Sequence, residues 1–148
     1  MSFRISETPI DPAAVKRELP DPAAGAFVAF EGWVRNHNED RPVDSLEYEA
    51  YAELAEKEGA RILAEARARF DLLGAVCVHR VGHLKPGDLA IWAGVTAAHR
   101  GDAFAACRYL VDEAKARVPI WKKEYYTDGA TQWINCATRG DAIDGPAP

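Results

Sequence analysis

Residues 74–97, GAVCVHRVGHLKPGDLAIWAGVTA, are the stretch of the chain that points most directly to its fold. Runs of β-branched and apolar residues predict one strand over Gly74–Gly82 and a second over Asp88–Ala97. Pro86 and Gly87 lie in the link between them. This pair is typical of a type II turn, whose third residue needs the positive φ that glycine adopts freely. We therefore expect two neighbouring strands joined by a tight connection.

Helical periodicity occurs on both sides of this pair of strands. Residues 53–70 carry apolar side chains near helical spacing and predict an amphipathic helix, and residues 102–118 predict a second one. The predicted buried face of the second helix consists of Phe104, Cys107, Val111, Ala114 and Val118. Further strands are predicted over residues 25–35, 43–51, 120–127 and 131–135, and a short helix capped by Asp11 over residues 11–19.

The order of these elements after the short first helix is β, β, α, β, β, α, β, β. It indicates one α+β domain with two long helices and mostly antiparallel, hairpin-linked strands. A ferredoxin-like sandwich is the alternative that this order allows. The 148 residues are close to the usual size of one domain. We expect the domain to span residues 1–136 and residues 137–148, with their Gly, Asp and Pro, to form a flexible tail.

Composition narrows the classes of function. Hydrophobic residues make up 48% and charged residues 28% of the chain, as is typical of globular proteins. No apolar run reaches the roughly 18–20 residues of a membrane span. The first residues also lack the pattern of a secretory signal, so we expect a soluble, cytoplasmic protein. The net charge of −5 argues against nucleic-acid binding. The three cysteines include no CxxC pair and predict neither disulfides nor a metal site.

Two segments combine cations in a way that suits an anionic ligand. Residues 98–102, AHRGD, lie where a strand meets the start of a helix, and free backbone N–H groups there, with His99 and Arg100, form a candidate phosphate or carboxylate site. The alternative is that Arg100 pairs with an acidic residue and His99 packs at the junction.

The second segment is KARVPIWKKE, residues 115–124. Strand alternation places Lys122 and Glu124 on one face and Lys123 on the other, so at most one of the adjacent lysines faces a given pocket. The alternative for each lysine is solvated surface charge. Arg35, at the end of a predicted strand, is a weaker candidate of the same kind.

Four motifs in order, FEGWVRNHN (30–38), HRVGHLKPGD (79–88), VTAAHRGDAF (95–104) and KARVPIWKKE (115–124), resemble the catalytic (large) subunit of molybdopterin synthase. The resemblance runs from about Gly25 to Trp133. It implies an α/β-hammerhead fold and a central homodimer. It also implies a small ubiquitin-like sulfur-carrier subunit at each end, which makes a heterotetramer. The carrier's C-terminal Gly-Gly thiocarboxylate would deliver sulfur to cyclic pyranopterin monophosphate and so make the molybdopterin dithiolene. No cofactor and no metal are implied.

The resemblance also implies which residues form the site. Lys115 would be the central catalytic residue, which protonates a leaving oxygen or stabilises a tetrahedral species at the thiocarboxylate carbon, and Lys122 would assist it. Arg100 would clamp the phosphate. The expected pocket lining is Trp33, Val34, Arg35, His99, Arg100, Lys115, Lys122, Lys123 and Glu124. Trp33 stands where some relatives carry a basic or polar residue. Arg139 is the nearest candidate for a basic residue that relatives carry after the last strand, and it is not among the expected lining residues.

Three other functions compete with this one. The chain could be a non-catalytic adaptor that binds a ubiquitin-like tail, although tail binding alone would not need both lysines with Arg35, His99 and Arg100. It could be a cysteine-dependent sulfurtransferase using Cys136. It could also be a pterin or nucleotide phosphate-binding enzyme that acts without a protein partner.

Overall fold

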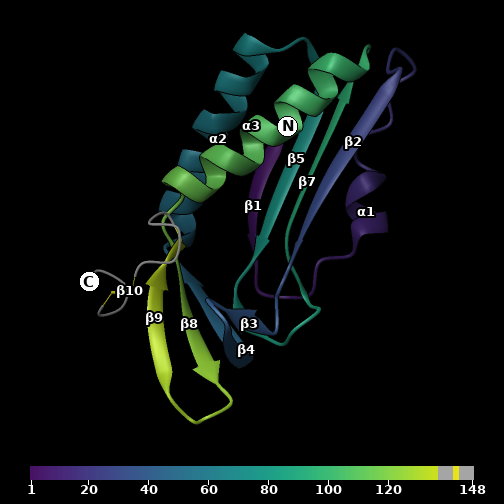
Figure 1. The fold of residues 1–148 in the computed structure, drawn as a ribbon. Helices are drawn as coiled ribbons and strands as arrows, with labels where there is room; N and C mark the ends of the chain where they lie inside the picture. Colours follow the sequence, from purple (N-terminus) through teal and green to yellow (C-terminus); the bar gives the residue numbers. More distant parts are fainter. Residues whose placement is uncertain (137–141, 144–148) are drawn as a thin grey trace.

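The structure is a computed structural model that describes residues 1–136 and 142–143. Figure 1 shows the arrangement of the helices and strands along the chain. In chain order these are β1 (Ser2–Ser6), α1 (Pro12–Lys16), β2 (Ala26–Trp33), β3 (His37–Asn38), β4 (Arg41–Ala50), α2 (Ala52–Arg69), β5 (Leu72–Arg80), β6 (Gly82–Leu84), β7 (Leu89–Ala97), α3 (Arg100–Arg117), β8 (Ile120–Tyr126), β9 (Thr131–Asn135) and β10 (Ala142–Ile143).

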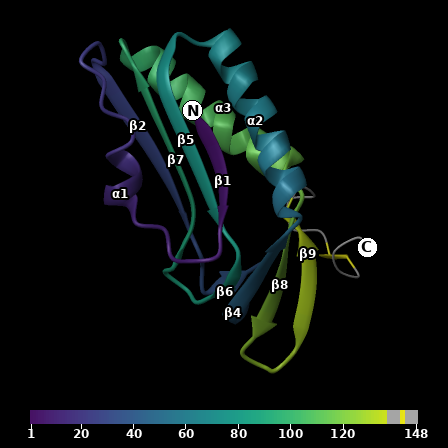
Figure 2. The same ribbon diagram turned by 180° about the vertical axis from the view of Figure 1, so that it is seen from behind.

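The first sheet has the strand order β1-β5-β7-β2 and carries most of the core. β1 pairs parallel with β5, and the other neighbours are antiparallel. Alternate residues of its strands face opposite sides, so Cys77 and Ala93 pack beneath α2 and α3, while Val78 and Trp92 pack near α1 on the other face. Figures 1 and 2 show the two long helices on one face and α1 on the opposite one.

The second sheet has the order β10-β9-β8-β4-β3, with β6 paired to β4, and it extends from one end of the first sheet (Figure 1). β6 was not predicted, because it begins at Gly82, the last residue of the predicted strand, and continues into the predicted link. Gly82 has a φ of +101°, so the chain turns there and β6 joins β4 instead of continuing along β5. The described residues therefore form a mixed α+β fold with mostly antiparallel strands, as predicted. A ferredoxin-like sandwich has a single sheet, so that alternative is wrong.

The link between the two central strands contains the predicted turn. The N–H of Asp88 donates to the backbone oxygen of Lys85 over 3.0 Å, and Gly87 has a φ of +91°. The cap of the first helix is also as predicted, because the Asp11 carboxylate accepts from the N–H of Ala13 over 3.1 Å. That helix ends at Lys16, earlier than the sequence suggests.

Other expectations need correction. β1, β3 and β10 were not predicted, although β1 alone forms five register pairs with β5 from Ser2 to Ser6. Phe104 was placed on the buried face of α3 but is 63% exposed, because Ala103 and Ala106 take the inward positions on this face, where small side chains let the helix approach the sheet. Cys107, Val111, Ala114 and Val118 are buried as predicted.

The C-terminal segment is described only at β10, which pairs with β9. The predicted flexible tail of residues 137–148 otherwise lies outside the described residues, and so does Arg139. Among the residues that the structure describes, no helix has the length and apolar character needed to cross a membrane.

Candidate functional site

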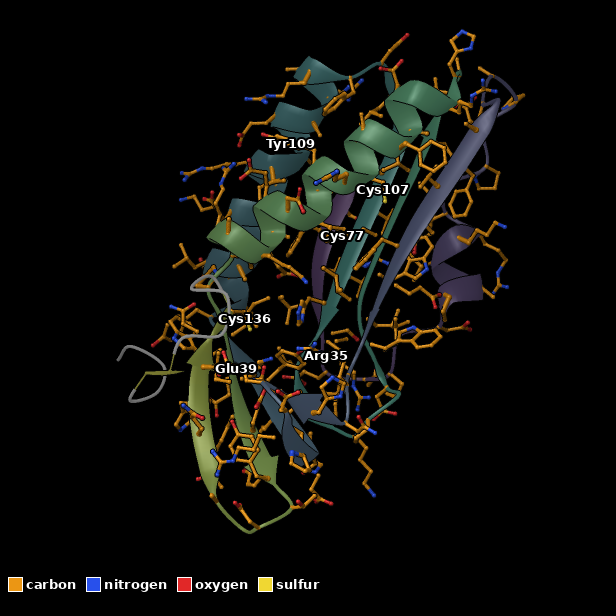
Figure 3. All side chains as sticks on the ribbon, in the orientation of Figure 1. Arg35, Glu39, Cys77, Cys107, Tyr109 and Cys136 are labelled. Atoms are coloured by element: carbon orange, nitrogen blue, oxygen red, sulfur yellow. The ribbon has the colours of Figure 1, made fainter. Side chains whose placement is uncertain are left out.

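A cavity of about 670 Å³ lies between the C-terminal half of α3 and the region where the two sheets meet. Figure 3 shows Arg35 and Cys136, two of its lining residues, below this end of the helix. The lining residues are Gly32, Trp33, Arg35, Asn38, Tyr48, His79, Ala90, Ile91, Arg108, Asp112, Ala114, Lys115, Ala116, Val118, Ile120, Lys122 and Cys136. Residues from both sheets and from α3 thus contribute to one recess.

Three cationic side chains that the motifs singled out line this cavity together: Arg35, Lys115 and Lys122. Arg35 follows the end of β2, Lys115 lies in the last turn of α3, and Lys122 is in β8. They are far apart in the sequence, and the fold brings them to one place. Several positive charges around a recess attract an anionic ligand such as a phosphate or a carboxylate.

A buried acidic residue holds Lys122 at the cavity wall. The Nζ atom of Lys122 lies 3.1 Å from Oε1 of Glu124, whose side chain is 2% exposed. Asn38 donates from Nδ2 to the other carboxylate oxygen over 3.2 Å. Residues 122 and 124 share one face of β8, as the alternation predicted. Glu124 does not itself line the cavity, so its role is to fix the position of the Lys122 ammonium.

His79 and Tyr48 also line the cavity, and neither was among the predicted site residues. The Nδ1 atom of His79 lies 2.8 Å from the backbone oxygen of Arg80, and its ring meets that of Tyr48 edge-on with the centroids 4.9 Å apart. Burial lowers the pKa of His79 to about 4; the hydrogen bond to the Arg80 carbonyl opposes this shift, and the nearby charge of Lys115 adds to it. The imidazole is therefore neutral at neutral pH.

Comparison with known sequences identifies the family. A family model described as "MoaE protein" matches residues 5–117. The chain belongs to the MoaE family. Its similarity to the molybdopterin synthase catalytic subunit of Oryza sativa subsp. indica is 42% identity over 145 residues, which cover 94% of this chain and 75% of that protein. The resemblance inferred from the four motifs is confirmed.

Solved structures of MoaE relatives have the same fold. A crystal structure of molybdopterin synthase from Staphylococcus aureus superposes with a TM-score of 0.84 at 36% identity, covering 88% of this chain and 95% of that one. A complex of subunits 1 and 2 of molybdopterin-converting factor from Helicobacter pylori 26695 matches with a TM-score of 0.72 at 20% identity, covering 93% and 92% of the two chains. At that identity the second match concerns the fold alone.

Two residues expected in the pocket of this MoaE chain face elsewhere. Val34 is 6% exposed and packs in a small core with Leu46, Leu84 and Ala90, because strand-like alternation turns it away from the side to which Trp33 and Arg35 point. Lys123 lies on the opposite face of β8 from Lys122. Its Nζ is 5.3 Å from the ring centroid of Tyr125 and 5.8 Å from that of Trp133. Neither residue lines the cavity.

Trp33 lies at the rim of the cavity. Its side chain is 65% exposed, and its Nε1 donates to Oε1 of Glu31 over 3.2 Å. A large indole that stays mostly in water at the mouth of a cavity is available to contact whatever enters.

His99 and Arg100 are not part of this cavity in a single chain. Arg100 begins α3 and Lys115 lies near its end, and fifteen residues of helix span about 22 Å at a rise of about 1.5 Å each. Both residues are exposed, and within residues 1–136 and 142–143 Arg100 makes no ion pair. The alternative in which Arg100 pairs with an acidic residue therefore finds no support in the described chain.

The three cysteines differ in their surroundings (Figure 3). Cys77, in β5, and Cys107, on the buried face of α3, lie in the main core, as predicted for small apolar fillers. Cys136 lines the cavity, and burial raises the pKa of its thiol, an effect that the charges of Lys122 and Lys115 oppose and that of Glu124 reinforces. This thiol is therefore protonated at neutral pH, which makes it a weak nucleophile. No group of three or more metal-ligating side chains occurs among the described residues.

Proposed function

We propose that this chain is the catalytic subunit of a molybdopterin synthase. It would act as a sulfurtransferase from the thiocarboxylated C-terminus of a small ubiquitin-like carrier to cyclic pyranopterin monophosphate. The observation that carries the proposal is the meeting of Arg35, Lys115 and Lys122 at one cavity of about 670 Å³. A recess of this size accommodates a small heterocycle. Membership of the MoaE family supports the reaction, and the arrangement of sheets and helices is consistent with an α/β-hammerhead.

Both proposed ligands are anions, which explains the chemistry of the cavity. The thiocarboxylate and the cyclic phosphate each carry negative charge, and Arg35, Lys115 and Lys122 provide N–H donors to meet it. As the sulfur bonds to the pterin side chain, an oxygen of that side chain must leave. Release of the sulfur from the carrier then breaks the C–S bond at the acyl carbon. A water molecule adds its oxygen to that carbon, so the carrier afterwards ends in a carboxylate.

Within this scheme Lys115 delivers a proton to the leaving oxygen or stabilises the oxyanion that forms when water adds to the acyl carbon. Its place in the last turn of α3 fixes its backbone. Lys122, fixed by Glu124, keeps an ammonium at the cavity wall to hold the anionic substrate or the carboxylate product. Each sulfur transferred consumes one loaded carrier, so two carriers are needed for one dithiolene.

His99 and Arg100 can serve this cavity only if a second copy of the chain supplies them. Such an arrangement would agree with the homodimer that the motifs imply. Two exposed apolar side chains are available to such an interface: Phe104, in the second turn of α3, is 63% exposed, and Phe30, on the edge strand β2, is 36% exposed. In such a dimer, Arg100 of one copy would hold the phosphate above Lys115 of the other.

Mixed dimers test this arrangement. Lys115→Ala and Arg100→Ala chains are each expected to be inactive alone. After co-refolding in equal amounts, half of the dimers contain both chains, and one of their two sites is intact, so about a quarter of the wild-type activity should return. Mixtures that stay inactive would show that both residues must come from one chain, and the proposal of a site shared between two chains would be wrong.

Reconstitution tests the function itself. The purified chain is incubated with cyclic pyranopterin monophosphate and either the thiocarboxylated carrier or the same carrier ending in an ordinary carboxylate, and molybdopterin is assayed. We expect product only with the thiocarboxylated form. Carrier binding without product from either form would favour the adaptor, and product formation from free sulfide without any carrier would favour the enzyme without a partner.

A further inference from the structure

His79 has one ring nitrogen committed and one free. Its Nδ1 lies 2.8 Å from the backbone oxygen of Arg80. A carbonyl oxygen only accepts hydrogen bonds, so Nδ1 carries the proton and donates it. In a neutral imidazole the other nitrogen, Nε2, is then an acceptor with a lone pair. Nε2 has no hydrogen-bond partner among the described residues, and the ring lines the cavity.

The position of this acceptor is well fixed. The His79 side chain is 9% exposed, and the edge of one ring meets the face of the other where it packs against Tyr48. The hydrogen bond to Arg80 and the contact with Tyr48 restrain both the tilt and the flip of the imidazole. Burial also lowers the pKa of His79, so the lone pair is available throughout the neutral range.

Buried acceptors are few among the described side chains of this cavity. Arg35, Lys115 and Lys122 offer only donors, and the nearby carboxylate of Glu124 is already bound by Lys122 and Asn38. Asp112 also lines the cavity, but its side chain is 66% exposed and accepts from Arg108 over 3.4 Å. A pterin ring has N–H groups as well as acceptor atoms, and an N–H group that is buried without an acceptor weakens binding. A neutral imidazole meets this need without reducing the positive charge that the anionic parts of the ligands require.

We propose that His79 is a substrate-recognition residue whose Nε2 accepts a hydrogen bond from an N–H group of the substrate's heterocycle. The proposal rests on the proposed function. It adds the residue that recognises the pterin ring, whereas the cationic side chains bind the anionic groups. In this role His79 binds the substrate and takes no proton from it. Its loss therefore weakens substrate binding and leaves the chemical step nearly unchanged.

Two substitutions separate recognition from structure. In His79→Asn the amide N–H can still donate to the Arg80 carbonyl, but the acceptor at the position of Nε2 is lost. In His79→Gln the longer side chain can place an amide oxygen near that position. His83→Asn is the matched control, because His83 is exposed and does not line the cavity. Thermal unfolding of all three variants checks that they fold.

The dissociation constant for cyclic pyranopterin monophosphate is measured by calorimetry, and KM and kcat are measured with the thiocarboxylated carrier. We expect His79→Asn to raise the dissociation constant and KM roughly tenfold with kcat changed less than about twofold. His79→Gln should recover most of the affinity, and His83→Asn should match the wild type. The affinity for the carrier should not change.

Unchanged substrate affinity in a folded His79→Asn would overturn the proposal, and so would a loss confined to kcat. A failure of the proposed function would look different. In that case the wild-type chain itself makes no molybdopterin, whereas failure of the His79 proposal leaves a fully active wild type and an equally tight-binding variant.

Discussion

The Nζ atom of Lys122 lies 3.1 Å from Oε1 of Glu124, and the Glu124 side chain is almost completely buried while that of Lys122 is 20% exposed. This asymmetry decides how the pair responds to substitution. The lysine can be hydrated when its partner is removed, but the carboxylate cannot. Removing Lys122 leaves a buried charge, whereas removing the charge of Glu124 leaves a cation that can turn toward water.

We therefore expect Lys122→Met to lower the free energy of unfolding by about 3 kcal/mol and Glu124→Gln to lower it by only about 1 kcal/mol. The double variant should lose less than the sum of the two. Urea unfolding at pH 7 measures all three. Equal losses for the two single variants would show that the pair is hydrated and does not fix Lys122.

Arg117 joins α3 to α2 through two carboxylates. This contact makes the free energy of unfolding depend on pH. Its guanidinium donates to both oxygens of Glu65 over 2.8 and 2.7 Å and to Glu58 over 2.9 Å. The hydrogen bonds from Arg117 lower the pKa of Glu65 to about 2, with a smaller contribution from the Tyr109 hydroxyl, while burial opposes the shift. A group whose pKa is lower in the folded than in the unfolded state stabilises the fold above the unfolded pKa, and this stabilisation is lost as the pH falls.

For Glu65 this window extends from about pH 4.5 down to about pH 2. We expect Glu65→Gln to have a lower urea midpoint than the wild type at pH 6, with the two midpoints converging toward pH 2. Parallel curves with a constant difference between pH 6 and pH 2 would contradict the assignment of this titration to Glu65. Circular dichroism in urea at several pH values follows both proteins.

Gly59 marks a close contact between α2 and β1. A Cβ atom at this position would collide with the ring of Phe3. Alanine should gain about 1 kcal/mol of helix propensity over glycine, but overpacking of this kind costs about 1–3 kcal/mol, so Gly59→Ala is expected to be destabilising. Gly101, in the first turn of α3, has open space around its Cβ position, and Gly101→Ala should leave stability unchanged or raise it by up to about 1 kcal/mol. Thermal unfolding of both variants measures the contrast, and a stabilising Gly59→Ala would show that β1 does not pack as described.

Cys136 distinguishes the proposed mechanism from a cysteine-dependent one. Its thiol lines the cavity, so alkylation can block substrate entry even if the sulfur has no chemical role. Replacement by a smaller residue avoids that ambiguity. We expect Cys136→Ala to retain molybdopterin synthesis within about twofold of the wild type, because sulfur arrives on the carrier and a protonated thiol is a weak nucleophile. A loss of more than about a hundredfold would favour the cysteine-dependent sulfurtransferase.

The elements that the sequence predicts well are those with a strong local pattern. Both long helices, the two central strands and the turn at Gly87 follow from periodicity and turn chemistry. β1 was missed although its five residues alternate between polar and apolar, because so short a run is a weak signal and its pairing partner, β5, is about seventy residues away in the sequence. Phe104 was misplaced because hydrophobicity favours the large side chain, whereas the close approach of α3 to the sheet selects Ala103 and Ala106.

For the site, the motifs identified residues that the fold brings together, but they could not show distances. Arg35, Lys115 and Lys122 meet at the cavity, while His99 and Arg100 are separated from it by the length of α3. His79 was missed because a histidine in an apolar strand resembles a core residue. Only the tertiary structure shows that His79, near the end of β5, lies close to Lys115 and lines the same cavity.

The most direct measurement compares two lysine variants in the reconstituted reaction. Wild type, Lys115→Ala and Lys123→Ala are incubated with thiocarboxylated carrier and cyclic pyranopterin monophosphate, and the rate of molybdopterin formation is measured. Lys115 lines the cavity and Lys123 lies on the far face of β8, so both variants lose the same charge from different places. We predict a fall of at least about a hundredfold for Lys115→Ala and less than about twofold for Lys123→Ala. Equal rates for the two variants would contradict the assignment of the reaction to this cavity.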